Sequence, residues 1–304
     1  MSSTQGAAPS GRSRLGAARP AVRQSLNARL MISGASGSGK TRTSLMIAAS
    51  LAEDDGRVLC VDTEVDSALT YADDFDFDHI RWEPPYDPRD LAVTLDEAGA
   101  SHDVVIVDST SHFWRAEGGV LSIADGRFTG WKDARPAHQQ LVDSIVRCDA
   151  HVILCARSKM EHVQEQDGGK WVVRKIGMKP IQDDELEYEL QVSMVMDQSH
   201  RLAVSKSRVL SVPVGHEYPA GRAFEFADTY GAWLKGGQPI VDRETADGWR
   251  DRIGAVSDAD ARKALKEEFL SRFGRPHLVE AERSVEVEAW LGARVDGDDG
   301  EDEA

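Results

Sequence analysis

A segment near the amino terminus has the spacing of a phosphate-binding loop. Residues 34–41 read Gly-Ala-Ser-Gly-Ser-Gly-Lys-Thr, a full match to GxxxxGK[ST]. Glycines in this pattern let successive N–H groups point at phosphate oxygens, and the following helix adds the positive end of its dipole. Lys40 would reach the β- and γ-phosphates, and the Thr41 hydroxyl would bind Mg²⁺. The predicted nucleotide ligands are Gly34, Ser36, Gly37, Ser38, Gly39, Lys40 and Thr41.

Two carboxylates follow apolar segments and could complete a nucleotide site. Asp108 ends the run VVIVD at 104–108, and an acid at the end of a buried strand can hold Mg²⁺ through water. Glu64 lies just beyond the run VLCVD at 58–62, where it could act as a general base toward water in line with the γ-phosphate. The simpler alternatives are a solvated aspartate at a strand end and a surface glutamate in an acidic stretch. Together with the loop, both residues favour Mg²⁺-dependent ATP hydrolysis.

A parallel sheet would bring these residues to one edge. The pattern predicts strands at 29–33, 58–62, 79–82, 104–108 and 151–156, and helices at 40–52, 87–98 and 133–148. Strands that alternate with helices imply a mainly parallel sheet. After Arg157 the pattern changes to antiparallel pairs, a hairpin through the turn at 167–169 and a second pair from 186–196 and 201–206. The predicted class is therefore α/β, with antiparallel strands after the parallel ones.

Composition divides the chain into four parts. Residues 1–28 are rich in Ser, Ala, Gly and Arg, which predicts a disordered basic arm because too little apolar surface is available for burial. Arg- and Ser-rich composition is also typical of an organellar transit peptide, but a basic tail is the simpler interpretation. Residues 29–237 hold the α/β domain, and residues 238–294 a small helical domain whose last helix is expected at 285–293. An acidic disordered tail occupies residues 295–304.

Charge is segregated along the 304 residues. The formal net charge is −16, from 36 Lys and Arg against 52 Asp and Glu. Residues 50–108 carry 17 acids and three Arg, whereas residues 157–179 carry six bases and three acids. The acidity of the whole chain therefore does not exclude a nucleic-acid partner.

Cysteine usage and hydropathy indicate the compartment. No apolar run approaches the roughly 20 residues that span a bilayer, so we expect no membrane segment. The three cysteines, Cys60, Cys148 and Cys155, include no CxxC pair. Reduced core cysteines and a cytoplasmic location are the expectation.

With the loop, Glu64 and Asp108 in this order, the chain resembles the RecA-like P-loop ATPases. The segment VDTEVDSALTYADDFDFDHI resembles the one that carries their catalytic glutamate, and VVIVDST resembles their Mg²⁺-binding strand. The resemblance is closest to phage-encoded single-strand-annealing and recombination ATPases reduced to the RecA core, and it covers about residues 29–234. Further matching segments are FTGW at 128–131, HVILCAR at 151–157, GMKP at 177–180, LEYE at 186–189 and SKSR at 205–208.

The resemblance implies ATP and Mg²⁺ as cofactors, and head-to-tail homo-oligomers with ATP between protomers. Lys206 and Arg208 are the candidate bases that would act on a neighbour's site, with an exposed edge strand as the simpler interpretation. The usual polar sensor, often Gln, is replaced by Arg157 and Ser158 at the end of the strand that stops at Ala156. The family also implies a role in DNA recombination or repair, with a single-strand-binding protein or a replication protein as a further partner.

Bases and an aromatic residue after Ala156 suit single-stranded DNA, since bases contact phosphates and aromatic rings stack on nucleobases. The equally supported alternative is a solvated hairpin. The candidate DNA ligands are Arg157, Lys159, Lys170, Trp171, Arg174, Lys175 and Lys179.

Two other functions compete with a DNA-dependent ATPase. The first is a nucleotide-gated assembly or accessory factor that acts through protein partners without binding DNA. The second is a small-molecule P-loop kinase, against which the position of Glu64 and the long antiparallel section argue.

Overall fold

The computed structural model describes residues 25–53, 55–167, 170–236, 243–258, 261–266, 268, 277–280 and 283–286, without the side chains of 160–178, 243–247, 250, 277–280 and 283–286. Asn27–Leu234 form one compact unit, and the described residues from Lys235 onward belong to a second. The predicted arm lies outside this description as far as residue 24, and the predicted acidic tail lies wholly outside it.

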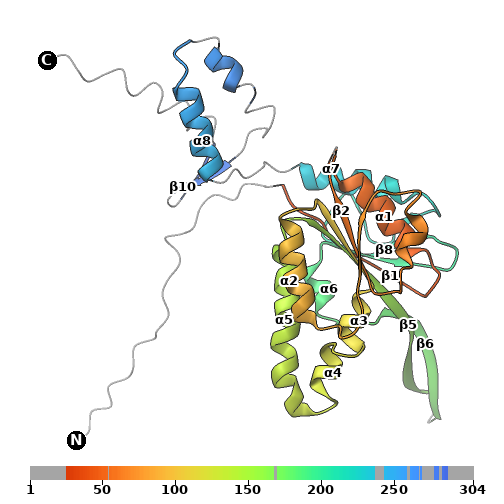
Figure 1. Cartoon of the computed structure of the whole chain (residues 1–304). Coiled ribbons are helices and arrows are strands. Elements are labelled where there is room, and N and C mark those ends of the chain that lie inside the picture. The colour runs from red at the N-terminus through yellow and green to blue at the C-terminus, as the bar shows by residue number, and fades with distance from the viewer. Residues whose placement is uncertain are drawn as a thin grey trace, which may run out of the picture. The chain divides into compact units, whose positions relative to one another are not determined.

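Nine of the described strands form one sheet with the order β3-β2-β4-β5-β1-β7-β8-β9, and β6 pairs with β5 off this path (Figure 1). From β3 to β7 neighbouring strands are parallel, whereas β8 and β9 are antiparallel additions. The strands are β1 (Arg29–Gly34), β2 (Val58–Asp62), β3 (Asp78–Arg81), β4 (Val104–Asp108), β5 (His151–Asp167), β6 (Lys170–Pro180), β7 (Val192–Met196), β8 (Leu202–Ser207) and β9 (Glu217–Tyr218). The predicted α/β class, with a mainly parallel sheet followed by antiparallel strands, is confirmed.

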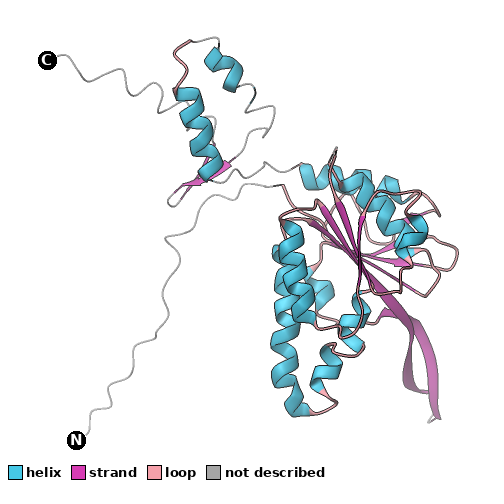
Figure 2. Cartoon of the chain, in the orientation of Figure 1, coloured by secondary structure: helices cyan, strands magenta, loops and turns pink. Residues whose placement is uncertain are grey.

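Helices cover both faces of the sheet (Figure 2). On one face α1 (Lys40–Leu51) and α7 (Ala223–Lys235) pack on the strands, and on the other α2 (Pro88–Gly99) and α5 (Trp131–Arg147) do so. Every residue of β1, β2 and β4 is buried, because a parallel sheet covered on both faces has no solvent side. This burial explains why these strands read as continuous apolar runs.

Short helices connect the larger elements. They are the α-helices α3 (Thr110–Arg115), α4 (Val120–Ala124) and α6 (Leu186–Glu189), and the 3₁₀ helices η2 (Ala68–Tyr71) and η3 (Phe128–Gly130). The prediction that residues 186–196 form one strand is wrong over its first part, since Leu186–Glu189 is helical and the strand begins at Val192. Leu186 is the buried residue of α6, so this turn packs on the core without joining the sheet.

The fifth strand is longer than predicted. β5 continues past Ala156 to Asp167, and its outer half pairs with β6 in antiparallel register from Ser158–Pro180 to Asp167–Lys170. The two strands leave the body of the sheet as a ribbon (Figure 1). The predicted hairpin is therefore present, continuous with the strand that was expected to end at Ala156.

The second unit contains α8 (Arg243–Gly254) and a two-stranded antiparallel sheet of β10 (His277–Glu280) and β11 (Arg283–Glu286). Trp249 and Ile253, four residues apart on α8, are buried. The expected helix at 285–293 is wrong at its start, because Val285 and Glu286 are in β11; the remainder lies outside the described residues. Across the described residues no helix is long and apolar enough to cross a membrane. Cys60, Cys148 and Cys155 are free and buried.

Candidate functional site

The phosphate loop connects β1 to α1 and depends on three glycines. Gly37 and Gly39 have φ values of +75° and +93°, in the left-handed region that glycine adopts without a steric penalty. A Cβ on Gly34 would lie 2.7 Å from the Met196 carbonyl oxygen and 2.6 Å from the Ser38 hydroxyl oxygen, so no side chain fits there. The predicted loop therefore lies between a strand and a helix, with left-handed backbone at Gly37 and Gly39.

Lys40 opens α1 and folds back over the loop. Its Nζ donates to the Ala35 carbonyl oxygen at 2.9 Å, and the residue is 8% exposed. Within the described part of the chain, the hydrogen bond of this ammonium group goes to a backbone carbonyl and not to a carboxylate. This is the place where a phosphate would supply the missing negative charge.

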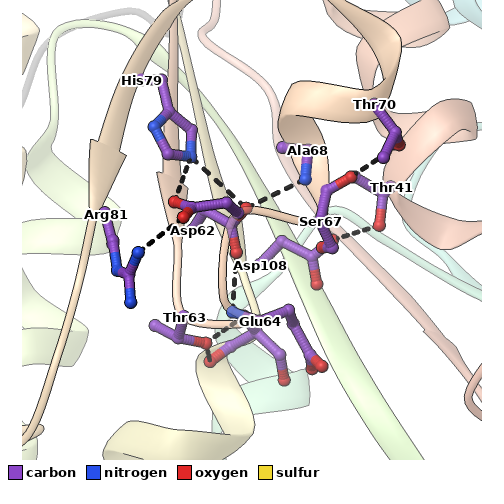
Figure 3. Close-up of polar contacts among 12 residues, drawn as sticks. Thr41, Asp62, Thr63, Glu64, Ser67, Ala68, Thr70, His79, Arg81 and Asp108 are labelled. Atoms are coloured by element: carbon purple, nitrogen blue, oxygen red, sulfur yellow. Dashed lines mark hydrogen bonds and ion pairs between the residues drawn. The ribbon is translucent and has the colours of Figure 1, made fainter.

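Thr41 and Asp108 meet as predicted. The Thr41 hydroxyl donates to Asp108 Oδ2 at 2.5 Å (Figure 3). Asp108 is 2% exposed. Burial raises the pKa of Asp108 to about 6, although the hydrogen bond from Thr41 opposes the rise. Because this value is below 7, the carboxylate is the prevailing form at neutral pH.

A hydroxyl and a carboxylate oxygen are the ligands that Mg²⁺ prefers, so these residues fit the cation that the motif implies. Within the described part of the chain, no group of three or more His, Cys, Asp and Glu could hold a metal. A cation between Thr41 and Asp108 would therefore complete its shell with water and phosphate oxygens. Its chemical contribution would be to neutralise charge on the β- and γ-phosphates.

Asp62 holds the loop that carries Glu64. Its buried carboxylate accepts from the Glu64 N–H at 2.6 Å and the Ala68 N–H at 2.9 Å, and His79 Nε2 lies 3.4 Å away (Figure 3). Between these amides Val65 and Asp66 have φ values of +57° and +62°, which cost energy in residues other than glycine. Asp62 thus stabilises a strained turn that fixes the backbone of Glu64. The sequence interpretation missed this residue, although an acid ending an apolar run was the same signal that identified Asp108.

Asp62→Ala should lower the free energy of unfolding by about 2–4 kcal/mol, because the buried N–H of Ala68 and the part-buried N–H of Glu64 would lose their acceptor. The measurement is urea unfolding followed by circular dichroism. Asp78→Ala is the matched control, since the carboxylate of Asp78 is half exposed and pairs with the side chains of Arg57 and His102; its loss should cost about 1 kcal/mol. Equal losses for the two variants would contradict the role of Asp62.

Glu64 is paired with Arg157. Arg157 Nε donates to Glu64 Oε1 at 2.6 Å, and Arg157 Nη2 donates to Glu64 Oε2. Burial acts to raise the pKa of Glu64, but the hydrogen bond and charge of Arg157 outweigh it and the pKa is lowered. Arg157, which the sequence placed among the DNA ligands, therefore lies beside Glu64 and lines the same cavity as the phosphate loop. Its place follows from the register of the sheet, where Arg157 on β5 is opposite Gly34 on β1.

These groups share one cavity of about 770 Å³, within the usual range for small-molecule sites. Its walls are the phosphate loop with the start of α1, the segment from Glu64 to Tyr71, Asp108 and Arg157. Ala220, Gly221 and His200 close another side. The cavity thus combines phosphate donors, a cation site and a carboxylate that could act on water.

The turn between β7 and β8 contacts the phosphate loop through two side chains, which the sequence did not indicate. His200 Nδ1 is 2.8 Å from the Ser38 carbonyl oxygen, and Gln198 Nε2 donates to the Ser36 carbonyl oxygen at 3.4 Å. This contact arises because β7 is parallel to β1, so the residues after both strands meet. Only the strand order could have revealed it.

Lys206 and Arg208 lie away from the phosphate loop of their own chain. Lys206 on β8 pairs with Ser193 on β7. Met196, three residues further along β7, is the residue that pairs with Gly34. The Lys206 ammonium donates to the carbonyl oxygens of Glu187 and Leu190, and Arg208 donates to that of Tyr188. Both bases therefore bind the end of α6 in this chain, and their action on a neighbour stays a prediction.

The other candidate DNA ligands follow the ribbon. Lys159 is exposed on β5, and Lys179 Nζ pairs with Asp184 Oδ2 at 2.6 Å. Lys170, Trp171, Arg174 and Lys175 are residues of β6, and their side chains lie outside the described part of the structure.

The fold and the cavity define a P-loop nucleotide-binding domain of the α/β class. The sequence matches the family AAA_24, described as an AAA domain, over residues 26–223. The chain therefore belongs to this family of P-loop ATPase domains. Among solved structures, a KaiC-like protein from the hyperthermophilic archaeon Pyrococcus horikoshii is 14% identical, with 62% of this chain and 83% of that chain covered at a TM-score of 0.38. No curated protein matches the sequence significantly.

Proposed function

We propose that this chain is an Mg²⁺-dependent ATPase that binds single-stranded DNA and acts in phage or prophage recombination or repair. The observation that carries the ATPase part is the shared cavity of Lys40, Thr41, Asp108 and Glu64. Lys40 would neutralise the transferring phosphate, Thr41 and Asp108 would hold Mg²⁺, and Glu64 would accept the proton of the attacking water.

The ribbon of β5 and β6 supports the DNA-binding part. It projects from the same edge of the sheet as the cavity, because β5 passes Arg157 before it leaves the body (Figure 1). Residues 159–179 carry five Lys and Arg against three acids, within a chain that is acidic overall. Basic residues on the ribbon would bind the phosphates of a single DNA strand. Because the ribbon begins beside the cavity, nucleotide binding there could change its affinity for DNA.

An assembly with ATP between protomers is part of the proposal. Lys206 and Arg208 cannot serve the site of their own chain, since they lie toward the other end of the sheet. A head-to-tail neighbour would have to present them, after release from the α6 carbonyls that they contact here.

The DNA part is tested with a triple variant, Lys170→Ala, Arg174→Ala and Lys175→Ala. We expect it to bind labelled single-stranded oligonucleotide at least about tenfold more weakly in the presence of Mg²⁺ and an ATP analogue. The plot of log association constant against log salt concentration should become shallower, with a slope smaller in magnitude by about 2, since three phosphate contacts are removed. Fluorescence anisotropy across a salt series is the measurement.

The matched control replaces Arg57, Arg89 and Lys235 with alanine, an equal change of net charge at exposed positions away from the ribbon. Equal binding by the ribbon variant and the wild type would refute DNA contact by β6. Nucleotide-dependent oligomers that ignore DNA would instead identify an accessory factor acting through protein partners.

A further inference from the structure

Arg157 occupies both oxygens of the carboxylate that the proposed hydrolysis needs. The guanidinium meets the carboxylate through two adjacent donors, Nε and Nη2, which is the strongest arrangement for an Arg–carboxylate pair. Glu64 is also partly withdrawn from solvent, with 22% of its side chain exposed against 42% for Arg157. The guanidinium binds both oxygens of this carboxylate and stabilises its ionised form, which makes Glu64 a weaker acceptor for the proton of a water, so we expect the pair to open before hydrolysis.

The surroundings allow the Arg157 side chain to move while its backbone stays in place. The Arg157 N–H donates to the Ser111 hydroxyl at 2.9 Å, and the residue is paired with Gly34 across the sheet. Glu64 is fixed in the same manner, since Asp62 holds its N–H. A rearrangement would therefore be confined to the two side chains.

A triphosphate would supply the competing partner. Arg157 lines the same cavity as Lys40, Thr41 and Asp108, and guanidinium groups bind phosphate through two parallel donors as they bind carboxylate. A triphosphate would bring one more charged group into this cavity than a diphosphate, and Arg157 is level with Gly34 at the start of the phosphate loop. A diphosphate ends one group earlier and leaves the ion pair without a competitor.

We propose that Arg157 is a γ-phosphate-dependent switch that pairs with Glu64 while the site is empty or holds ADP, and passes to the γ-phosphate when ATP binds. The exchange frees Glu64 only when a hydrolysable phosphate is present. It gives this chain a way to distinguish ATP from ADP through a residue of its own. The inference rests on the proposed function in that it places ATP in this cavity.

The test is a double-mutant cycle read by nucleotide affinity. Dissociation constants of a non-hydrolysable ATP analogue and of ADP are measured with Mg²⁺ by calorimetry for the full chain, Glu64→Gln, Arg157→Ala and the double variant. Glu64→Gln should tighten the analogue about three- to tenfold relative to ADP, because the cost of opening the pair disappears. Arg157→Ala should weaken the analogue about tenfold or more and leave ADP unchanged.

The double variant decides between a switch and a general charge effect. In the Arg157→Ala background, Glu64→Gln should no longer favour the analogue over ADP. An equal gain in both backgrounds, or equal weakening of the analogue and ADP by Arg157→Ala, would overturn the switch. Arg57→Ala, which removes the exposed pair with Asp78, is the control for loss of an arginine ion pair, and thermal unfolding of each variant checks folding.

Arg157→Lys gives a second test, the affinity for the ATP analogue, which would not change in this way if Arg157 had only a structural role. A lysine retains the charge but not the two-donor geometry, so Arg157→Lys should recover part of the affinity for the analogue that Arg157→Ala loses, while ADP affinity stays unchanged in both variants. Since the cycle needs binding and not turnover, a wild type that binds the analogue without hydrolysing ATP would overturn the proposed ATPase and still return a result for the switch.

Discussion

Lys40→Ala is expected to weaken ATP binding by about 100-fold or more. The Lys40 ammonium donates to the Ala35 carbonyl oxygen across the loop, and in the proposed site it would supply the positive charge for the β- and γ-phosphates. Hydrogen bonds to charged groups contribute roughly 1.5–3 kcal/mol each, and the loss of a charge in a partly buried site adds to this. The measurement is titration of a fluorescent ATP analogue in the presence of Mg²⁺.

Lys235→Ala is the matched control for Lys40→Ala. Lys235 is exposed in the last turn of α7, so its loss changes net charge equally without touching the cavity. We expect wild-type affinity for this control and an unchanged unfolding midpoint for both variants. An affinity of Lys40→Ala within threefold of wild type would mean that the nucleotide does not bind in this loop.

The phosphate site was predictable because its signals are local. GASGSGKT specifies its own turn, through glycines at positions that need positive φ. Asp108 could be assigned because a buried parallel strand reads as an unbroken apolar run. The acid that ends such a run lies at the carboxyl edge of the sheet. The contact between Thr41 and Asp108 then follows from the common edge at which parallel strands end.

Arg157 shows where local signals fail. Its charge and its neighbours Lys159 and Lys170 favoured a DNA ligand, and nothing within the segment distinguishes a base at the pocket from a base on the ribbon. The distinction comes from pairing, since β5 is adjacent to β1 and Arg157 is level with Gly34. Strand order depends on contacts between residues distant in the sequence, so the periodicity of one segment does not predict it.

Asp62 was passed over for a related reason. Hydrophobic periodicity reports that a side chain is buried, but not what the buried group binds. The acceptor role of Asp62 depends on the backbone of Val65 and Asp66, which takes a conformation that neither residue favours. The length of β5 was likewise set by pairing with β6, so the end of its apolar run at Ala156 did not mark the end of the strand.

Glu64→Gln should retain ATP binding and lower the rate of hydrolysis by about 10²–10⁴-fold, the usual contribution of a positioned general base. The amide keeps the size of the side chain but cannot accept the proton of the attacking water. Asp62 would still hold the backbone of residue 64, so the defect should fall on kcat with little rise in KM. Phosphate release under saturating ATP and Mg²⁺ measures it.

Glu83→Gln is the control, because Glu83 makes only an exposed ion pair with Arg81 and lies outside the cavity. The choice between two roles of Glu64 depends on the size of the effect. If Glu64 served only as an anchor for Arg157, Glu64→Gln would release the guanidinium toward the phosphate and turnover would be unchanged or faster. A large loss of kcat together with tighter binding of the ATP analogue requires both parts: a carboxylate that acts on water, and an arginine that restrains it until ATP arrives.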